Sequence, residues 1–298
     1  MLPSELAEIY GPLLRVGPIH APGGPHPSVQ RLLFADGTHV IAKRYLFYPM
    51  TAGHPHDLLE TETEVTRQLS EAGCRTPAVL ATDPAQGIIY FEYVSGPTLD
   101  DAMQTSDPVT RARLADRVVD AFVAMQETFV NAEDTLEHRV APGTDPETVR
   151  SNFVDAVEGM GFPVGTNAVD LARELATRPL QLGPTDYNAR NILITNDDTP
   201  CFIDLGKVGY DWPERRLVQY ATSLGANRPG ARVKSLLDPI AVERWRRHGG
   251  ATTTLDGHHF LLHAIAAARG LPQSRALLLT KLSEDERVGE LRRLAGKG

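Results

Sequence analysis

The stretch from Leu182 to Lys207, LGPTDYNARNILITNDDTPCFIDLGK, decides the fold. Two short apolar runs, 192–194 and 202–203, flank a polar Asn-Asp-Asp turn, and this pattern predicts a β-hairpin. A hairpin holds the outer ends of its two strands side by side. We therefore expect Asn191, just before the first strand, and Asp204, just after the second, to lie close together.

Three oxygen-bearing side chains, Asp186, Asn191 and Asp204, then converge on one point. An amide and a carboxylate suit Mg²⁺, which takes hard oxygen ligands and leaves positions open for phosphates. Asn191 and Asp204 are therefore the candidate metal ligands. Asp186 remains to accept a proton or to orient a hydroxyl, and is the candidate catalytic residue. The alternative is a surface hairpin with scattered acids.

This arrangement resembles the protein-kinase-like superfamily, whose catalytic loop reads His-x-Asp-x-x-x-x-Asn and whose metal-binding turn reads Asp-Phe-Gly. Asp186 and Asn191 have the spacing of that loop, and Asp204 follows at the usual separation. TDYNARNILI and FIDLGK look most like the aminoglycoside-phosphotransferase-like and lipopolysaccharide (Kdo)-kinase-like branches. The chain departs from the pattern twice, with Pro184 in place of the His that braces the loop and Leu205 in place of Phe.

The resemblance implies an α+β, two-lobed protein-kinase-like fold. Residues 1–95 would form a small N-lobe, with five antiparallel strands and one helix. Residues 96–298 would form a larger, mainly helical C-lobe with the catalytic loop, the metal turn and the substrate-binding helices. The implied cofactors are ATP and Mg²⁺. The implied reaction moves the γ-phosphate to a hydroxyl of a small molecule, such as an aminoglycoside, another antibiotic, a sugar or an amino-alcohol.

The composition is that of a soluble globular protein, with 298 residues, 42% hydrophobic and 23% charged. No apolar run approaches the roughly 20 residues that cross a bilayer, and the N-terminus carries acids where a signal peptide is basic, so we expect a cytoplasmic protein without membrane contact. Two cysteines, Cys74 and Cys201, are too few for a disulfide framework. The net charge of −8 offers nucleic acid no attraction and slightly favours cationic acceptors.

The N-terminal part predicts three antiparallel strands near 13–16, 29–34 and 40–45, with a Pro/Gly-rich loop between the first two. In the resemblance, that loop covers the ATP phosphates with backbone N–H groups, and Gly23, Gly24 and Ser28 are the positions assigned to it. The motif G-x-G-x-x-G is not present, and a plain turn is the alternative.

Lys43 follows Val-Ile-Ala, where the kinase pattern has its phosphate-binding lysine. The alternative is a surface lysine at a strand end. Its partner should be an acid on the next predicted helix, 56–72. We select Glu62 because its spacing from the following apolar residues matches the family layout, which leaves Glu60 and Glu64 in solvent.

The segment 91–99 resembles the hinge between the lobes, with the boundary near Gly96. The resemblance assigns adenine contacts to the backbone of Glu92 and Val94. Leu193 of the hairpin belongs to the same implied nucleotide site.

Beyond the hinge, apolar residues at helical spacing predict a mainly helical chain. We expect helices at 111–129, 146–160, 167–177, 213–224, 238–249, 256–269 and 273–294. Three acids on these helices, Asp155, Glu158 and Asp170, are available to hold a substrate, although a solvated face is the favoured interpretation. Asp211, Arg215 and Arg216 could pair with the catalytic loop or lie in water, and water is the favoured interpretation.

Two other functions remain open at this stage. A kinase-fold binding or scaffold protein is suggested by Pro184 and the poor glycine loop. A protein kinase is disfavoured because the chain has no Ala-Pro-Glu triplet to end an activation segment. His258, His259 and His263 share a helix face but have no evident further ligand, so we expect no zinc there. The sequence does not identify the acceptor, the choice between ATP and GTP, or the oligomeric state.

Overall fold

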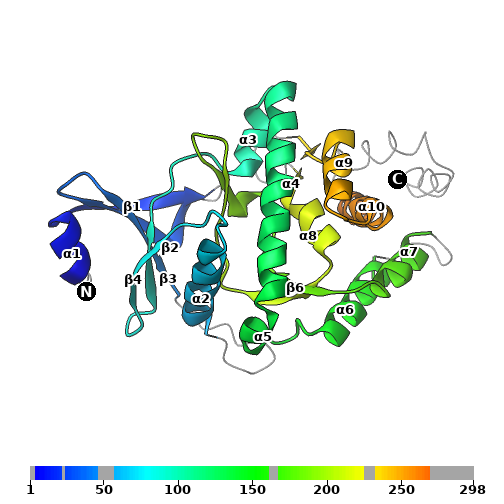
Figure 1. Cartoon of the computed structure of the whole chain (residues 1–298), viewed down its shortest axis with the longest axis horizontal. Coiled ribbons are helices and arrows are strands. Elements are labelled where there is room, and N and C mark those ends of the chain that lie inside the picture. The colour runs from blue at the N-terminus through cyan, green and yellow to red at the C-terminus, as the bar shows by residue number, and fades with distance from the viewer. Residues whose placement is uncertain (1–3, 22–23, 46–56, 161–166, 225–231, 269–298) are drawn as a thin grey trace.

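The computed structural model describes residues 4–21, 24–45, 57–160, 167–224 and 232–268. A five-stranded antiparallel sheet forms one end of the molecule and helices form the other (Figure 1). The strand order is β1-β2-β3-β5-β4. The elements of the sheet end are α1 (Ser4–Tyr10), β1 (Leu13–Ala21), β2 (Gly24–Phe34), β3 (His39–Arg44), α2 (Leu58–Glu71), β4 (Val79–Asp83) and β5 (Ile88–Glu92).

Strands β1 and β2 are longer than predicted, because most of the Pro/Gly-rich segment is paired strand instead of loop. Proline lacks a backbone N–H and is tolerated where a strand has a free edge. Pro18 lies on β1, which is the edge strand. Pro25 and Pro27 lie on β2 before its first pair with β3, which joins Val29 to Lys43. The prolines therefore remove no hydrogen bond between β2 and β3.

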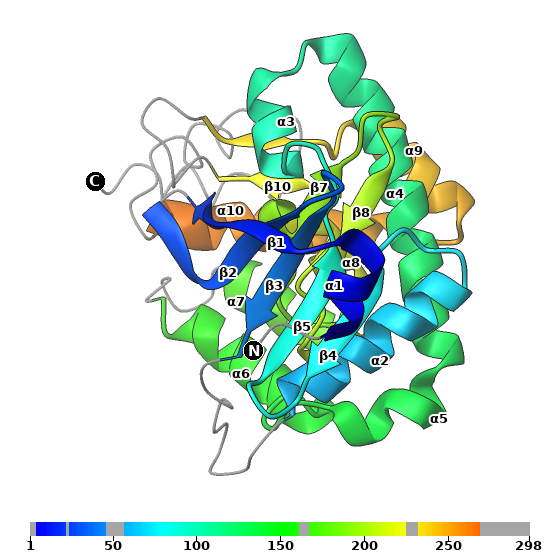
Figure 2. The same ribbon diagram turned by 90° about the vertical axis from the view of Figure 1, so that its left-hand side faces the viewer.

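A helix packs against each face of the sheet, and α1 lies in front of part of the strands in Figure 2. Side chains alternate along a strand. On β5, Ile88 and Tyr90 pack in one apolar cluster with Leu6 of α1. Ile89 and Phe91 point to the other face and pack with Leu59 of α2. The helix α2 is therefore held against the sheet, which positions Glu62 next to β3.

The helical end is built around α4, the long helix at the centre of Figure 1. Its residues Leu114, Val118, Phe122 and Met125 are all buried in the main core. The helical end contains α3 (Leu99–Thr105), α4 (Pro108–Asn131), α5 (Glu133–Leu136), η1 (Glu137–Arg139), α6 (Pro146–Glu158), α7 (Asn167–Ala176), β6 (Gln181–Pro184), η2 (Ala189–Asn191), β7 (Ile192–Ile194), β8 (Pro200–Phe202), β9 (Val208–Asp211), α8 (Pro213–Tyr220), β10 (Thr222–Ser223), β11 (Lys234–Ser235), α9 (Pro239–Arg247) and α10 (Thr252–Ala268).

The predicted helices differ from the observed ones mainly at their ends. Helix α8 stops at Tyr220 and not at residue 224, because Thr222 and Ser223 pair with β11. Helix α10 begins at Thr252, ahead of the predicted residue 256. The predicted helix 273–294 lies outside the described residues. Within the described part of the chain, no helix has both the length and the apolar character to cross a membrane.

The sheet end and the helical end meet where the chain passes the hairpin β7–β8. Gly96 has φ +148°, and a Cβ there would lie 1.9 Å from the carbonyl oxygen of Ile194. Only glycine fits such a contact without moving the backbone. The amide of Ile194 donates to the carbonyl of Pro97 at 2.8 Å, which ties the linker to the hairpin. We propose that the boundary between the lobes lies here, between residues 95 and 96.

Candidate active site

Lys43 joins the sheet to the hairpin. Its Nζ lies 2.7 Å from Glu62 Oε2 and 2.5 Å from Asp204 Oδ1. Glu62 Oε1 also accepts from the backbone amide of Leu205 at 3.2 Å. Strand β3, helix α2 and the turn after β8 therefore meet in one ion-paired group. Glu60 pairs with Arg139 and Glu64 with Arg67, so neither contacts Lys43.

Burial alone would lower the pKa of Lys43, but the carboxylates of Glu62 and Asp204 outweigh it and raise that pKa. Burial would raise the pKa of Asp204, and the nearby Lys43 more than compensates, so the pKa of Asp204 is lowered. The lysine is thus charged and Asp204 is ionised around neutral pH. Both charges are available to a bound triphosphate and its metal ion.

Asp204 has φ 62°, in the left-handed region that non-glycine residues seldom adopt. The turn this creates leaves the Asp204 side chain 44% exposed, with only Oδ1 on Lys43. Among the described residues, Oδ2 has no partner, so it can receive a metal ion. Such unusual backbone geometry persists where the surroundings impose it, and it is concentrated at functional sites.

Asp186 and Asn191 lie on the same loop and contact each other. Nδ2 of Asn191 donates to the backbone carbonyl of Asp186 at 2.8 Å, which directs the amide oxygen of Asn191 away from that carbonyl. The backbone amide of Ile203 donates to the carbonyl of Asn191 at 3.0 Å, so Asn191 is tied to the residue before Asp204. Asn191 and Asp204 supply an amide and a carboxylate oxygen, a donor set that fits Mg²⁺.

The carboxylate of Asp186 is exposed and accepts one hydrogen bond from Asn188 Nδ2, at 3.1 Å. The surrounding protein raises the pKa of Asp186, and the charge of Asp204 adds to the effect. Lys207 opposes it and also lowers the pKa of Asp204, so this lysine acts on both acids. Sequence reasoning missed Asn188 and Lys207, although both lie inside the stretch that decides the fold.

Arg216 of α8 fixes the backbone that leads into the predicted catalytic loop, and its side chain is fully buried. Its Nε donates to the carbonyl of Pro184 at 3.0 Å, and its Nη2 donates to the carbonyls of Gln181 and Gly209, each at 2.9 Å. Nη1 donates to Gln126 Oε1 of α4 at 3.1 Å. The position where the family has its bracing His is therefore braced through its backbone by an arginine.

The expectation that Asp211 and Arg216 would lie in water is wrong. Asp211 is buried, and it accepts from the Tyr187 hydroxyl, from the Trp212 amide at 2.8 Å and from Arg215 Nη1 at 3.0 Å. A signal for Arg216 was present in the sequence. Apolar residues precede it by three positions and follow it by one and by four, which puts Arg216 on the buried face of α8.

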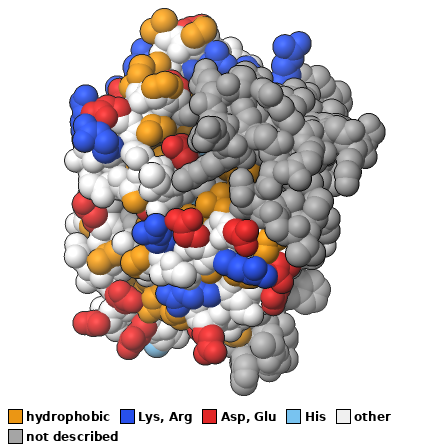
Figure 3. Space-filling view, turned by 90° about the vertical axis from the view of Figure 1, so that its right-hand side faces the viewer, with side chains coloured by type: hydrophobic (Ala, Val, Ile, Leu, Met, Phe, Trp, Pro, Cys, Tyr) orange, Lys and Arg blue, Asp and Glu red, His pale blue; other side chains and the backbone are white. Residues whose placement is uncertain are grey.

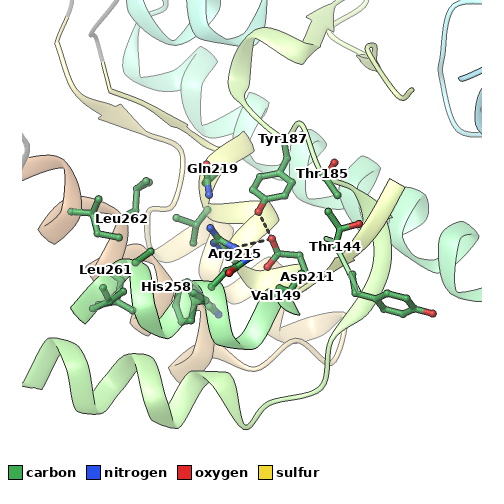
Figure 4. A pocket seen from close by; sticks show the side chains of 17 residues that line it. Thr144, Val149, Thr185, Tyr187, Asp211, Arg215, Gln219, His258, Leu261 and Leu262 are labelled. Carbon is green, nitrogen blue, oxygen red and sulfur yellow. Dashed lines mark hydrogen bonds and ion pairs between the residues drawn. The ribbon is translucent and has the colours of Figure 1, made fainter. Parts of the chain in front are cut away.

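A cavity of about 440 Å³ lies beside the catalytic loop. Thr185 and Tyr187, the neighbours of Asp186, form part of its wall, and most of the rest comes from α6, α8 and α10, with Thr144 and the end of β9 (Figure 4). Asp155, Glu158 and Asp170 lie outside the lining. Glu158 is paired with Arg173, and all three acids are exposed.

The positions assigned to the nucleotide lie along the junction of the two ends. Glu92 ends β5, and its side chain pairs with Arg75 at 2.6 Å. Val94 is buried, and within the described part of the chain no backbone hydrogen bond uses its amide. Leu193 is partly exposed on β7, opposite Thr98 of the linker. Gly24 and Ser28 lie on β2, whereas Gly23 lies outside the described residues.

Comparisons with known proteins give one family and many similar folds. The model of the phosphotransferase enzyme family (APH) matches residues 31–250. No curated protein sequence matches the chain. Among solved structures, the macrolide 2'-phosphotransferase MphH from Brachybacterium faecium has a TM-score of 0.57 at 14% identity, covering 98% of this chain and 95% of that one.

Two further structures have similar scores. The gentamicin complex of APH(2")-IIa has a TM-score of 0.54 at 9% identity, covering 99% of this chain and 95% of that one. The choline kinase LicA from Streptococcus pneumoniae has a TM-score of 0.51 at 12% identity, again covering 99% and 95%. These likenesses confirm the predicted kinase-like fold. The family match covers most of the sequence, and the chain belongs to the APH phosphotransferase enzyme family.

Proposed function

We propose that this protein transfers the γ-phosphate of ATP to a hydroxyl group of a small molecule. The observation that carries the proposal is the contact of Lys43 with both Glu62 and Asp204, which brings a phosphate-binding cation and a metal-binding acid to one point beside Asp186. The family match supports phosphotransferase chemistry.

Each polar residue has a distinct part in this proposal. Lys43 binds the phosphates of ATP, and Glu62 holds Lys43 in place. Asn191 and Asp204 hold Mg²⁺, which neutralises phosphate charge when bound. Asp186 orients the acceptor hydroxyl and accepts its proton as the phosphoryl group is transferred. Such a transfer depends mostly on positioning and charge, so an aspartate is a strong enough base.

The rest of the nucleotide site follows the same proposal. The carbonyl of Glu92 and the amide of Val94 contact the adenine edge, and Leu193 packs against its face. The β1–β2 hairpin covers the phosphates with backbone groups of Gly23, Gly24 and Ser28.

A small-molecule acceptor is supported by the relatives and by the short connection after Asp204. The three similar structures are a macrolide phosphotransferase, a complex with gentamicin and a choline kinase. Helix α8 begins at Pro213, which leaves no room in residues 205–212 for the activation segment of a protein kinase. An antibiotic is one candidate acceptor, and a role in antibiotic resistance would follow from it.

A binding or scaffold function was suggested by the missing brace at Pro184. Arg216 braces that residue, which removes the main reason for this alternative.

The test is a labelling experiment with two forms of ATP. The protein is incubated with Mg²⁺, a panel of hydroxylated compounds and ATP labelled in the γ- or the α-phosphate. We expect the γ-label, and not the α-label, to enter an acceptor. Transfer of the α-label would indicate nucleotidyl transfer, and no transfer to any acceptor despite ATP binding would support the binding protein.

A further inference from the structure

The cavity beside the catalytic loop is large enough for a drug-sized molecule, since such sites usually measure about 300–1,000 Å³. Thr185 and Tyr187, which flank Asp186 in the sequence, form part of its wall, so the cavity borders the loop that carries Asp186. Its lining therefore indicates which chemistry the acceptor has.

The described lining contains two side chains of opposite formal charge, Asp211 and Arg215, and no other charged side chain. They pair with each other at 3.0 Å. The Asp211 carboxylate is 6% exposed and also accepts from Tyr187 and from the Trp212 amide. Figure 4 shows the contacts of Asp211 with Tyr187 and Arg215 among the lining side chains. The acid of the described lining is thus fully engaged and offers nothing to a cationic group of a ligand.

Most of the remaining wall is apolar. Helix α6 contributes Val149 and Val157, α8 contributes Val218, and α10 contributes Leu261 and Ile265. On the surface that carries the ends of α9 and α10, acidic and basic side chains are interspersed in the described part (Figure 3). The excess of acidic over basic residues in the chain is therefore not concentrated on the described part of this surface, where it would attract cations.

One buried side-chain nitrogen of the described lining has no partner. His258 of α10 is 3% exposed, and its Nε2 is buried without a hydrogen bond. Its ring packs against Trp212 and Phe153, at centroid distances of 5.4 and 5.6 Å. The same burial closes Nε2 off from the cavity, so this nitrogen offers a ligand no hydrogen bond, and His258 contributes to the wall mainly through its ring.

We infer that the acceptor is an uncharged, largely apolar hydroxylated molecule that fills this cavity. This inference rests on the proposed function, since it assigns the cavity to the acceptor of that reaction. It replaces the expectation, drawn from net charge, of a cationic acceptor. Neutral oxygens suit Thr185, Gln219 and Asn152, and the apolar walls exclude water from the body of the ligand.

Binding without nucleotide tests the inference separately from the reaction. Isothermal titration would compare three probes: the nitrogen-free ring of a macrolide after removal of its sugars, gentamicin and choline. We expect the neutral ring to bind most tightly. Tighter binding of gentamicin or choline, or no detectable binding of the neutral ring, would overturn the inference even if phosphate transfer were found.

Matched variants locate the binding site. Ala156 lies in the lining and is exposed, so Ala156→Trp should block the cavity without disturbing the core. Ser151→Trp places the same side chain on α6 outside the lining. We expect Ala156→Trp to weaken binding of the neutral ring at least tenfold and Ser151→Trp to leave it unchanged. Equal effects of the two variants would place the ligand elsewhere.

An isosteric change tests the chemistry of the lining. Gln219→Glu adds a carboxylate and should weaken binding of the neutral ring while strengthening binding of gentamicin.

Discussion

Replacing Arg216 by lysine should loosen the catalytic loop while keeping the charge of the chain. The guanidinium serves the carbonyls of Pro184, Gln181 and Gly209 and the side chain of Gln126 at the same time. A single ammonium group has only three donors and cannot reproduce the planar fork. Four acceptors outnumber the three donors, and one ammonium cannot reach both sides of the fork, so we expect two of these acceptors to lose their partner.

Each buried acceptor without a partner costs about 1–3 kcal/mol, so Arg216→Lys should lower the free energy of unfolding by roughly 2–6 kcal/mol. This is a large share of the roughly 5–15 kcal/mol that stabilises a typical domain. We also expect kcat to fall, since the backbone of the loop carrying Asp186 is no longer fixed. The KM for ATP should change less, because Arg216 does not touch Lys43 or Glu62.

Urea unfolding followed by tryptophan fluorescence would measure the stability, with Trp212 directly before α8 as a local reporter. The control is Arg246→Lys, an exposed arginine on α9 paired with Glu243, which should change stability by less than about 0.5 kcal/mol. If Arg216→Lys lost less than about 1 kcal/mol and kept its kcat, the bracing role would be wrong.

Three further changes follow from single positions. Gly183→Ala would place a Cβ 2.7 Å from the Arg216 guanidinium and should lower the free energy of unfolding in urea by about 1–3 kcal/mol. The loss should be smaller in the Arg216→Lys background, and fully additive losses in the double variant would contradict the contact. Gly96→Ala would force a Cβ to 1.9 Å from the Ile194 carbonyl oxygen and should lower the free energy of unfolding by about 3 kcal/mol or more in the same assay. Gly249→Ala is the control, because its Cβ would have nothing within 4 Å and only the strain of the positive φ would lower the stability. Burial lowers the pKa of His258 to about 3 from 6.5, against the opposing influence of Asp211, and Arg215 adds to the shift. Below about pH 6.5 the unfolded chain therefore binds a proton at His258 that the folded chain does not bind, so the free energy of unfolding falls as the pH drops. Between about pH 8 and pH 5, the free energy of unfolding of His258→Phe should rise by about 2 kcal/mol relative to that of the wild type. A difference independent of pH would show that His258 is charged in the fold.

The sequence predicted the parts of the molecule that rest on local rules. The hairpin β7–β8 follows from its apolar runs and polar turn, and the choice of Glu62 for Lys43 follows from helical spacing between neighbouring elements. The strands near Val29 and Val40 follow from the Asp-Gly turn between them. In each of these cases the interacting residues are near in sequence or belong to adjacent elements.

Other parts depended on tertiary context. The Pro/Gly-rich segment looked like a loop because the position of β1 at the sheet edge, where proline is tolerated, is not visible locally. Arg216 looked exposed because a buried charge is rare, and its acceptors come from β6, β9 and α4, far along the chain. The lining of the cavity draws on α6, α8 and α10, which lie far apart in the sequence, so its charge cannot be read from the net charge of the chain.

The central claim is that Asp186 serves the chemistry and Asp204 serves the metal ion. It is tested most directly by measuring MgATP affinity and single-turnover phosphate transfer in Asp186→Asn and Asp204→Asn. We predict that Asp186→Asn binds MgATP as the wild type does and transfers phosphate about 10²- to 10⁴-fold more slowly. Asp204→Asn should lose the part of ATP affinity that depends on Mg²⁺. Transfer at the wild-type rate by Asp186→Asn would contradict the account.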